Sequence, residues 1–215
     1  MIRIFNLFFI IFFLLSAKAY SLIEIDITRG NLDPLPIAVS PLFQDDSSKR
    51  NSINELKIEN VGSEISLVVE NNLKISGLFN PLSKEAFLQK PDIAHLKPRF
   101  EDWALIKAQA LITGKVTIED KKLKVEFRLW DILAGREMMA LAFTTVPSNW
   151  RRVGHIISDK VYERLTGEKG YFDTRIIYVS EEGPKTARVK KLAIMDQDGF
   201  NTKYLTLGNE LVLTP

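Results

Sequence analysis

The sequence predicts an α+β fold in which two main helices pack on a sheet, followed by short strands that resemble one β-propeller blade. Apolar residues recur at helical spacing over residues 58–73 and 150–165. Segments with alternating or β-branched apolar residues precede each of these helices. The order strands, helix, strands, helix is typical of an α+β domain.

The first strands of this domain are short. Leu22–Ile27 alternates apolar and acidic residues with a period of two, which predicts a half-buried strand. Residues 36–43 form a second apolar strand, which Pro41 interrupts. Residues 44–54 are polar with mixed charge, so we expect a loop there.

The first helix is expected to stop at Ser76-Gly77, and a proline-containing loop follows over residues 84–98. The next three apolar segments predict an antiparallel meander, and they span residues 104–118, 123–131 and 137–146.

The second helix is expected over residues 150–165, and its apolar residues lie on one face. Ser148 is positioned to cap its start, and Gly167 follows its end.

After Gly170 the chain changes character. Three short strands are expected, at residues 174–180, 191–195 and 203–207, with Asp198-Gly199 in a hairpin turn. This is the pattern of a single propeller blade, and such a sheet is marginally stable by itself.

Residues Met1–Ala19 are typical of a cleavable signal peptide. Arg3 precedes an apolar segment, and Ser16–Ala19 ends in the small-x-small pattern that a signal peptidase accepts. The apolar segment spans at most 12 residues, whereas a bilayer-spanning helix needs about 20. We expect cleavage after Ala19 and export, with a retained anchor as the alternative. The predicted domains are a signal peptide (1–19), an α/β domain (20–165) and a linker with an incomplete blade (166–215).

The composition excludes several classes of site. The chain has no cysteine, which excludes disulfides, thiol catalysis and a lipid-modified cysteine. Removing Arg3 and Lys18 with the leader leaves as many Lys and Arg residues as the 27 Asp and Glu residues. A neutral mature chain does not indicate nucleic-acid binding.

No pattern of catalytic residues is present. His95 and His155 lie in different segments without a ligand at a fixed spacing, so we expect packing or surface roles for both. Asp196–Gly199 is similar to the start of a calcium loop, but its glycine comes too early. We therefore predict no enzyme, no cofactor and no metal site.

The segment Trp150–Val179 (WRRVGHIISDKVYERLTGEKGYFDTRIIYV) resembles the TolB family of the Tol-Pal cell-envelope system. Residues 36–39, 76–82 and 195–201 match other parts of the family's pattern. The resemblance covers the mature chain but only about half of a family member, because family members continue into a six-bladed propeller. We therefore expect a truncated copy.

The resemblance implies a non-enzymatic periplasmic adaptor that links inner- and outer-membrane components. Such an adaptor maintains outer-membrane integrity and supports envelope constriction at cell division. In the family, the N-terminus binds the inner-membrane protein TolA, and the propeller binds the lipoprotein Pal. The matching N-terminal residues here are Leu22, Ile23, Glu24, Ile25, Asp26, Ile27 and Thr28.

The alternation of apolar and acidic residues along Leu22–Thr28 suits binding by strand addition. The same pattern also fits an edge strand of the domain. Binding to Pal is doubtful because most of the propeller is missing. Two other interpretations are a remnant of a propeller-containing periplasmic peptidase and a non-functional fragment with exposed, aggregation-prone strand edges.

Overall fold

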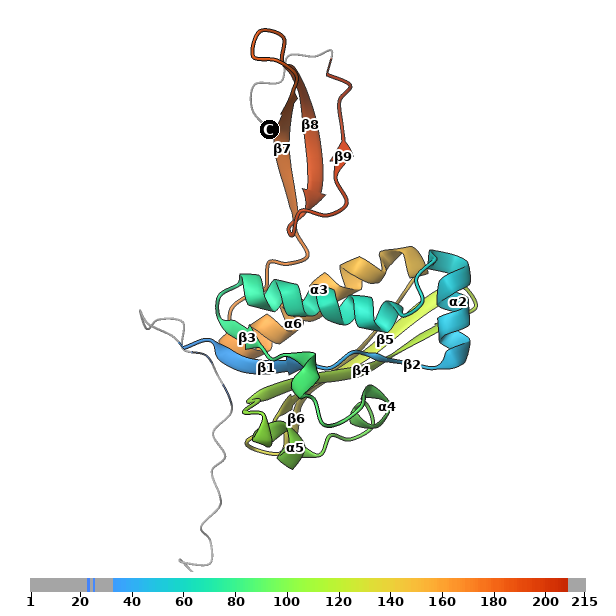
Figure 1. Ribbon diagram of the computed structural model, residues 1–215, viewed down its shortest axis with the longest axis vertical. Coiled ribbons are helices and arrows are strands. Elements are labelled where there is room, and N and C mark those ends of the chain that lie inside the picture. Colours follow the sequence, from blue (N-terminus) through green and yellow to red (C-terminus); the bar gives the residue numbers. More distant parts are fainter. Residues whose placement is uncertain (1–22, 24, 26–32, 209–215) are drawn as a thin grey trace, which may run out of the picture.

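The computed structural model describes Ile23, Ile25 and residues 33–208. The predicted signal peptide and the other five residues of the candidate segment lie outside these residues. The described chain forms a mixed α/β domain with helices on a sheet, and a separate three-stranded sheet follows it (Figure 1). None of the helices in these ranges has the length and apolar character that a membrane span requires.

The domain is built on a six-stranded sheet with the order β3-β1-β4-β5-β6, and β2 also pairs with β4. β1 runs parallel to β3 and β4, whereas β4, β5 and β6 form the predicted antiparallel meander. Its first strand starts at Ala110 and not at residue 104, because residues 100–105 form a helix. The strands are β1 (Leu35–Val39), β2 (Phe43–Gln44), β3 (Phe79–Pro81), β4 (Ala110–Glu119), β5 (Lys122–Asp131) and β6 (Arg136–Thr145).

Two long helices, α3 (Val61–Ile75) and α6 (Trp150–Thr166), cover one face of this sheet (Figure 1). Val125 and Phe127 of β5 and Ile157 of α6 are among the residues of the main core, each at most 1% exposed. The alternating residues of β5 therefore point toward the helices, as the sequence pattern predicts.

Gly154 brings α6 close to α3. A Cβ atom at this position would lie 2.8 Å from Val68 Cγ1, so any larger residue would force the helices apart. Gly167 ends α6 in the left-handed conformation, as predicted, with a φ of 76°. The expected cap by Ser148 is wrong, because a 3₁₀ turn, η2 (Pro147–Asn149), continues directly into the helix and no side chain caps it.

Short helical segments cover the opposite face of the sheet. They are η1 (Lys84–Ala86), α4 (Pro91–Ala94) and α5 (Phe100–Leu105), so the expected loop over 84–98 contains helical turns. Trp103 packs there in a second core cluster that includes Leu111 and Trp130.

Residues 44–54, expected to be a loop, form helix α2 (Asp46–Leu56) instead. Asp45 caps this helix by accepting a 2.8 Å hydrogen bond from the Ser48 amide. The buried residues of α2 are Ser48 and Ser52, and Ser48 Oγ accepts a hydrogen bond from the Ile118 amide of β4. Because serine covers the sheet here, hydrophobic periodicity does not detect the helix.

The last three strands form their own antiparallel sheet, as expected for the start of a blade. It contains β7 (Arg175–Glu182), β8 (Val189–Asp196) and β9 (Lys203–Tyr204) in that order. Gly199 has a φ of 88°, which confirms the turn predicted between β8 and β9. Ile176 and Ile177 point to opposite faces of β7 and are 39% and 50% exposed, so both faces of the sheet are open.

Candidate partner-binding segment and the junction with the blade

The described part of the predicted partner-binding segment lies against the end of α6. The Ile25 amide donates a 2.7 Å hydrogen bond to the Leu165 carbonyl. This carbonyl belongs to the last turn of the helix, where carbonyls lack partners within the helix. The Ile25 side chain is 9% exposed and belongs to the main core, and Ile23 packs against the same core.

Ile23 and Ile25 therefore both contact the domain, consistent with their spacing of two residues. Neither residue lies in a strand. At these two positions the chain is held by a helix terminus and by side-chain burial, not by the edge of the sheet. The structure does not describe Leu22, Glu24, Asp26, Ile27 or Thr28.

A second set of polar residues joins α6 to the turn between β8 and β9. The Arg151 guanidinium, on the first turn of α6, is paired with the Asp198 carboxylate and lies 3.9 Å from Asp196. It also stacks 3.9 Å from the centre of the Phe200 ring. The side chains of Arg151 and Asp198 are only 15% and 6% exposed, so this ion pair is largely excluded from water.

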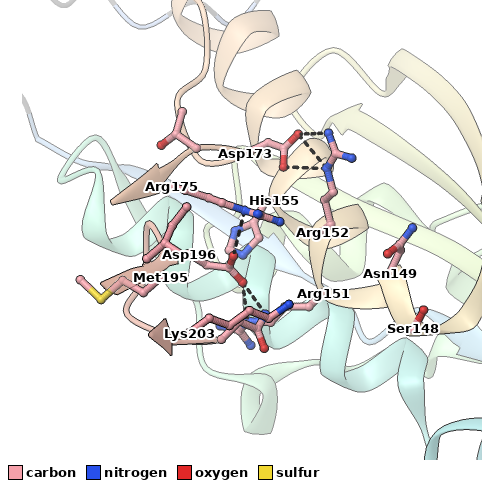
Figure 2. A pocket seen from close by; sticks show the side chains of 13 residues that line it. Ser148, Asn149, Arg151, Arg152, His155, Asp173, Arg175, Met195, Asp196 and Lys203 are labelled. Atoms are coloured by element: carbon pink, nitrogen blue, oxygen red, sulfur yellow. Dashed lines mark hydrogen bonds and ion pairs between the residues drawn. The ribbon is translucent and has the colours of Figure 1, made fainter. Parts of the chain in front are cut away.

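The loop between α6 and β7 is fixed by two carboxylates. Asp173 accepts hydrogen bonds from Arg152 Nε and Nη2, both at 3.0 Å (Figure 2). Asp159 accepts the backbone amides of Phe172 and Asp173. A Cβ atom on Gly170 would lie 2.4 Å from the Asp159 Cα, so the close approach of this loop to α6 requires glycine.

His155 lies one turn further along α6 and is 2% exposed. Its Nδ1 is 2.9 Å from Asn72 Nδ2 on α3, and the same amide nitrogen donates to Ser158 Oγ at 3.0 Å. Its Nε2 is 3.8 Å from the Asp198 carboxylate and makes no hydrogen bond. Burial lowers the pKa of His155 below its ordinary value, and the Asp198 charge opposes this effect.

Arg151, Arg152, His155 and Asp173 border a polar cavity of about 670 Å³ between the first turns of α6, the start of β7 and the end of β8. Asp196 lies in it between Arg151 and Arg175 (Figure 2). Ligand atoms of His155, Asp196 and Asp198 come within 4.8 Å of one another, which is a spacing that a metal ion could use.

These three residues nevertheless do not fit a metal ion. Both carboxylates already have counter-charges, because Arg151 pairs with Asp198 and Asp196 lies 3.9 Å from both Arg151 and Arg175. With the Asn72 amide oriented as in this structure, Nδ1 of His155 is the acceptor, so the neutral ring carries its proton on Nε2, the nitrogen that faces Asp198. Sequence reasoning identified Asp196–Gly199 only as a turn and missed its pairing with Arg151.

The chain matches known proteins along most of its length. Residues 23–138 match the family model of the TolB amino-terminal domain, and residues 162–215 match that of the TolB beta propeller domain. The chain is 79% identical over 207 residues to the Tol-Pal system protein TolB of Pelagibacter ubique (strain HTCC1062). This match covers 96% of the present chain and 46% of the relative, so the chain spans about half the relative's length.

The crystal structure of TolB from Acinetobacter baumannii has the same fold, with a TM-score of 0.65 and 24% sequence identity. The match covers 81% of the present chain and 39% of the solved one. Together with the match of the amino-terminal family model to more than half of the sequence, these results show that the chain belongs to the TolB family.

Proposed function

We propose that this chain is a non-enzymatic periplasmic adaptor of the Tol-Pal system, exported by a signal peptide that is cleaved after Ala19. Its role is to link inner- and outer-membrane components, and thereby to maintain outer-membrane integrity and support envelope constriction at cell division. The 79% identity to a Tol-Pal system protein supports this assignment. The partner on the inner-membrane side is a TolA-like protein, bound through Leu22–Thr28.

The observation that carries this proposal is the way in which Ile25 is held. One backbone hydrogen bond and one buried side chain attach it to α6. Such a hydrogen bond contributes about 1 kcal/mol, and burial of an isoleucine contributes about 1.5–3 kcal/mol. A partner that adds the segment to its own sheet gains several backbone hydrogen bonds at once, which is enough to compete with this attachment.

A peptide covering Tyr20–Asp33 tests the proposal. We expect it to bind the periplasmic domain of a TolA-like protein in isothermal titration calorimetry and to compete with the full chain for that domain. A matched peptide with Ile25→Pro loses an amide donor and should bind more weakly. If neither heat nor competition is observed with the unmodified peptide, the segment is not the binding element.

We also propose that this 215-residue chain binds a Pal-like lipoprotein weakly or not at all. The family resemblance places the Pal-binding surface on the propeller, and the described residues include three strands of it, β7 to β9. Surface plasmon resonance of the purified chain over immobilised Pal is the direct test. Tight binding would contradict this part of the proposal.

A further inference from the structure

His155 is a buried titratable group that the proposed adaptor function does not use. It lies on α6 between α3 on one side and the turn carrying Asp198 on the other, and it borders the cavity at the junction (Figure 2). Histidine is the side chain whose ordinary pKa lies closest to neutral pH. A histidine that is 2% exposed between two structural units therefore couples its protonation to their contact.

The hydrogen bonds around His155 are those of the neutral ring, with Nδ1 as the acceptor. Ser158 Oγ donates its proton to the Gly154 carbonyl at 2.9 Å, so this oxygen must accept from the Asn72 amide nitrogen. The same nitrogen then donates to His155 Nδ1. A second proton on the ring would have to sit on Nδ1, facing the N–H of Asn72. Protonation therefore requires the Asn72 amide to reverse and the Ser158 hydroxyl to turn its proton from the Gly154 carbonyl toward Asn72 Oδ1.

The charges around the ring do not compensate for protonation. Asp198 is the nearest carboxylate, but it is 3.8 Å from Nε2 and already pairs with Arg151. The other charged groups on this side are Asp196, which Arg151 and Arg175 share, and Asp173, which Arg152 holds. On the α3 side, the neutral Asn72 amide contacts the ring.

We propose that His155 is a proton-sensitive latch between the α/β domain and the blade. When the ring is neutral, it fills the space between Asn72 and the turn that carries Asp198. When it is protonated, the imidazolium gains hydration only by moving toward the cavity, and this requires the turn between β8 and β9 to withdraw from α6. Acidification below the ordinary histidine pKa of 6.5 therefore favours the loosened junction.

The direction of the pKa shift agrees with this geometry. Because burial at the closed junction lowers the pKa of His155, protons bind more tightly when the junction is open, and acid favours the open form. Protonation of His155 acts at the junction, whichever partner binds the N-terminal segment.

Distance measurements on the full chain test the latch. The chain has no cysteine, so spin labels can be attached at Asn71→Cys on α3 and Lys185→Cys between β7 and β8 without background labelling. We expect pulsed EPR to show one narrow distance distribution at pH 8 and an additional, longer component at acidic pH, below the ordinary histidine pKa of 6.5. His155→Gln should keep the narrow distribution at both pH values.

His95 provides the matched control, because the chain contains only two histidines. His95→Gln should retain the full pH response. A wild-type distance that does not change with pH, or a response that persists in His155→Gln, would overturn the proposal.

Ring ¹⁵N NMR of the wild-type chain gives a second readout that does not depend on any variant. It should show the Nε2–H tautomer at pH 8, and its titration midpoint should coincide with that of the distance change. Midpoints that differ clearly would also overturn the latch.

Discussion

The Arg151 guanidinium on α6 and the Asp198 carboxylate between β8 and β9 form an ion pair across 47 residues of sequence. They connect the α/β domain to the first strands of the blade, and Phe200 covers the guanidinium. Both charges are largely withdrawn from water. Each therefore depends on the other, because an unpaired buried charge is strongly unfavourable.

Removing one member of this pair should open the junction. Asp198→Asn leaves Arg151 without its closest counter-charge. We expect this variant to lower the free energy needed to open the junction by about 3 kcal/mol. Hydrogen exchange of the amides in β7 and β8 measures this loss. The matched control is Arg188→Gln, which removes the 3.1 Å pair with Glu181, whose partners are 40% and 38% exposed. The control should cost less than about 1 kcal/mol, and an equal effect of both variants would contradict the interpretation.

The sequence patterns predict the elements whose buried residues are apolar. The faces of α3, α6 and β5 repeat with the period of their secondary structure, so their positions follow from the sequence. Helix α2 was missed because its buried residues are Ser48 and Ser52, and hydrophobicity carries no signal for a polar residue that is buried and hydrogen-bonded.

The junction is harder to predict for a different reason. Asp198-Gly199 has the chemistry of a turn, and the structure confirms that turn. Nothing in the local pattern shows that Asp198 also pairs with Arg151, because long-range pairs leave no periodic signal. The same holds for His155, whose burial depends on Asn72 and Asp198 approaching it from two other segments.

Gly154→Ala should destabilise the α/β domain. The added methyl would lie 2.8 Å from Val68 Cγ1, and such overpacking costs about 1–3 kcal/mol. Urea unfolding followed by tryptophan fluorescence measures the change in the free energy of unfolding. Val68→Ala removes the contacting methyl groups, so the double variant should lose less stability than the sum of the two single variants. If the stability losses of the two single variants simply add in the double variant, the contact between residues 154 and 68 is not the cause of the loss in Gly154→Ala.

The Asp45 cap of α2 should make the free energy of unfolding of the domain depend on pH in the acidic range. The hydrogen bond from the Ser48 amide is the main cause that lowers the pKa of Asp45 below its ordinary value of 3.8. The ionised form is therefore favoured in the folded state, so its contribution is present above pH 3.8 and is lost as the pH falls through the lowered value. Asp45→Ala should cost about 1 kcal/mol at pH 7 and progressively less toward pH 2.5.

Urea unfolding at several pH values measures this difference between the wild type and Asp45→Ala. Asp45→Asn is the control, because an asparagine cap accepts the same hydrogen bond without titrating. Its stability relative to Asp45→Ala should not change with pH. A cost for Asp45→Ala that stays constant down to pH 2.5 would show that the cap does not act through the ionised carboxylate.

The free energy needed to release Ile25 from the domain should be smaller than the free energy needed to unfold the whole domain. Its amide has one partner, Leu165, at a helix end and none in the sheet. We expect this amide to exchange with solvent through local release, at a lower opening free energy than the amides of β5. Ile25→Ala should speed this release, whereas truncating a buried isoleucine in a global core costs about 2–5 kcal/mol of stability.

The two effects are separated by measuring both hydrogen exchange and urea unfolding of Ile25→Ala. Local release limits the loss of global stability, because the rest of the domain stays folded when the segment leaves. Ile23→Ala, at a half-buried position, should change both quantities less. If Ile25→Ala instead lowers the global free energy of unfolding by the full cost of a core truncation, the segment is an integral part of the domain. In that case it could not be exchanged to a partner without unfolding the domain.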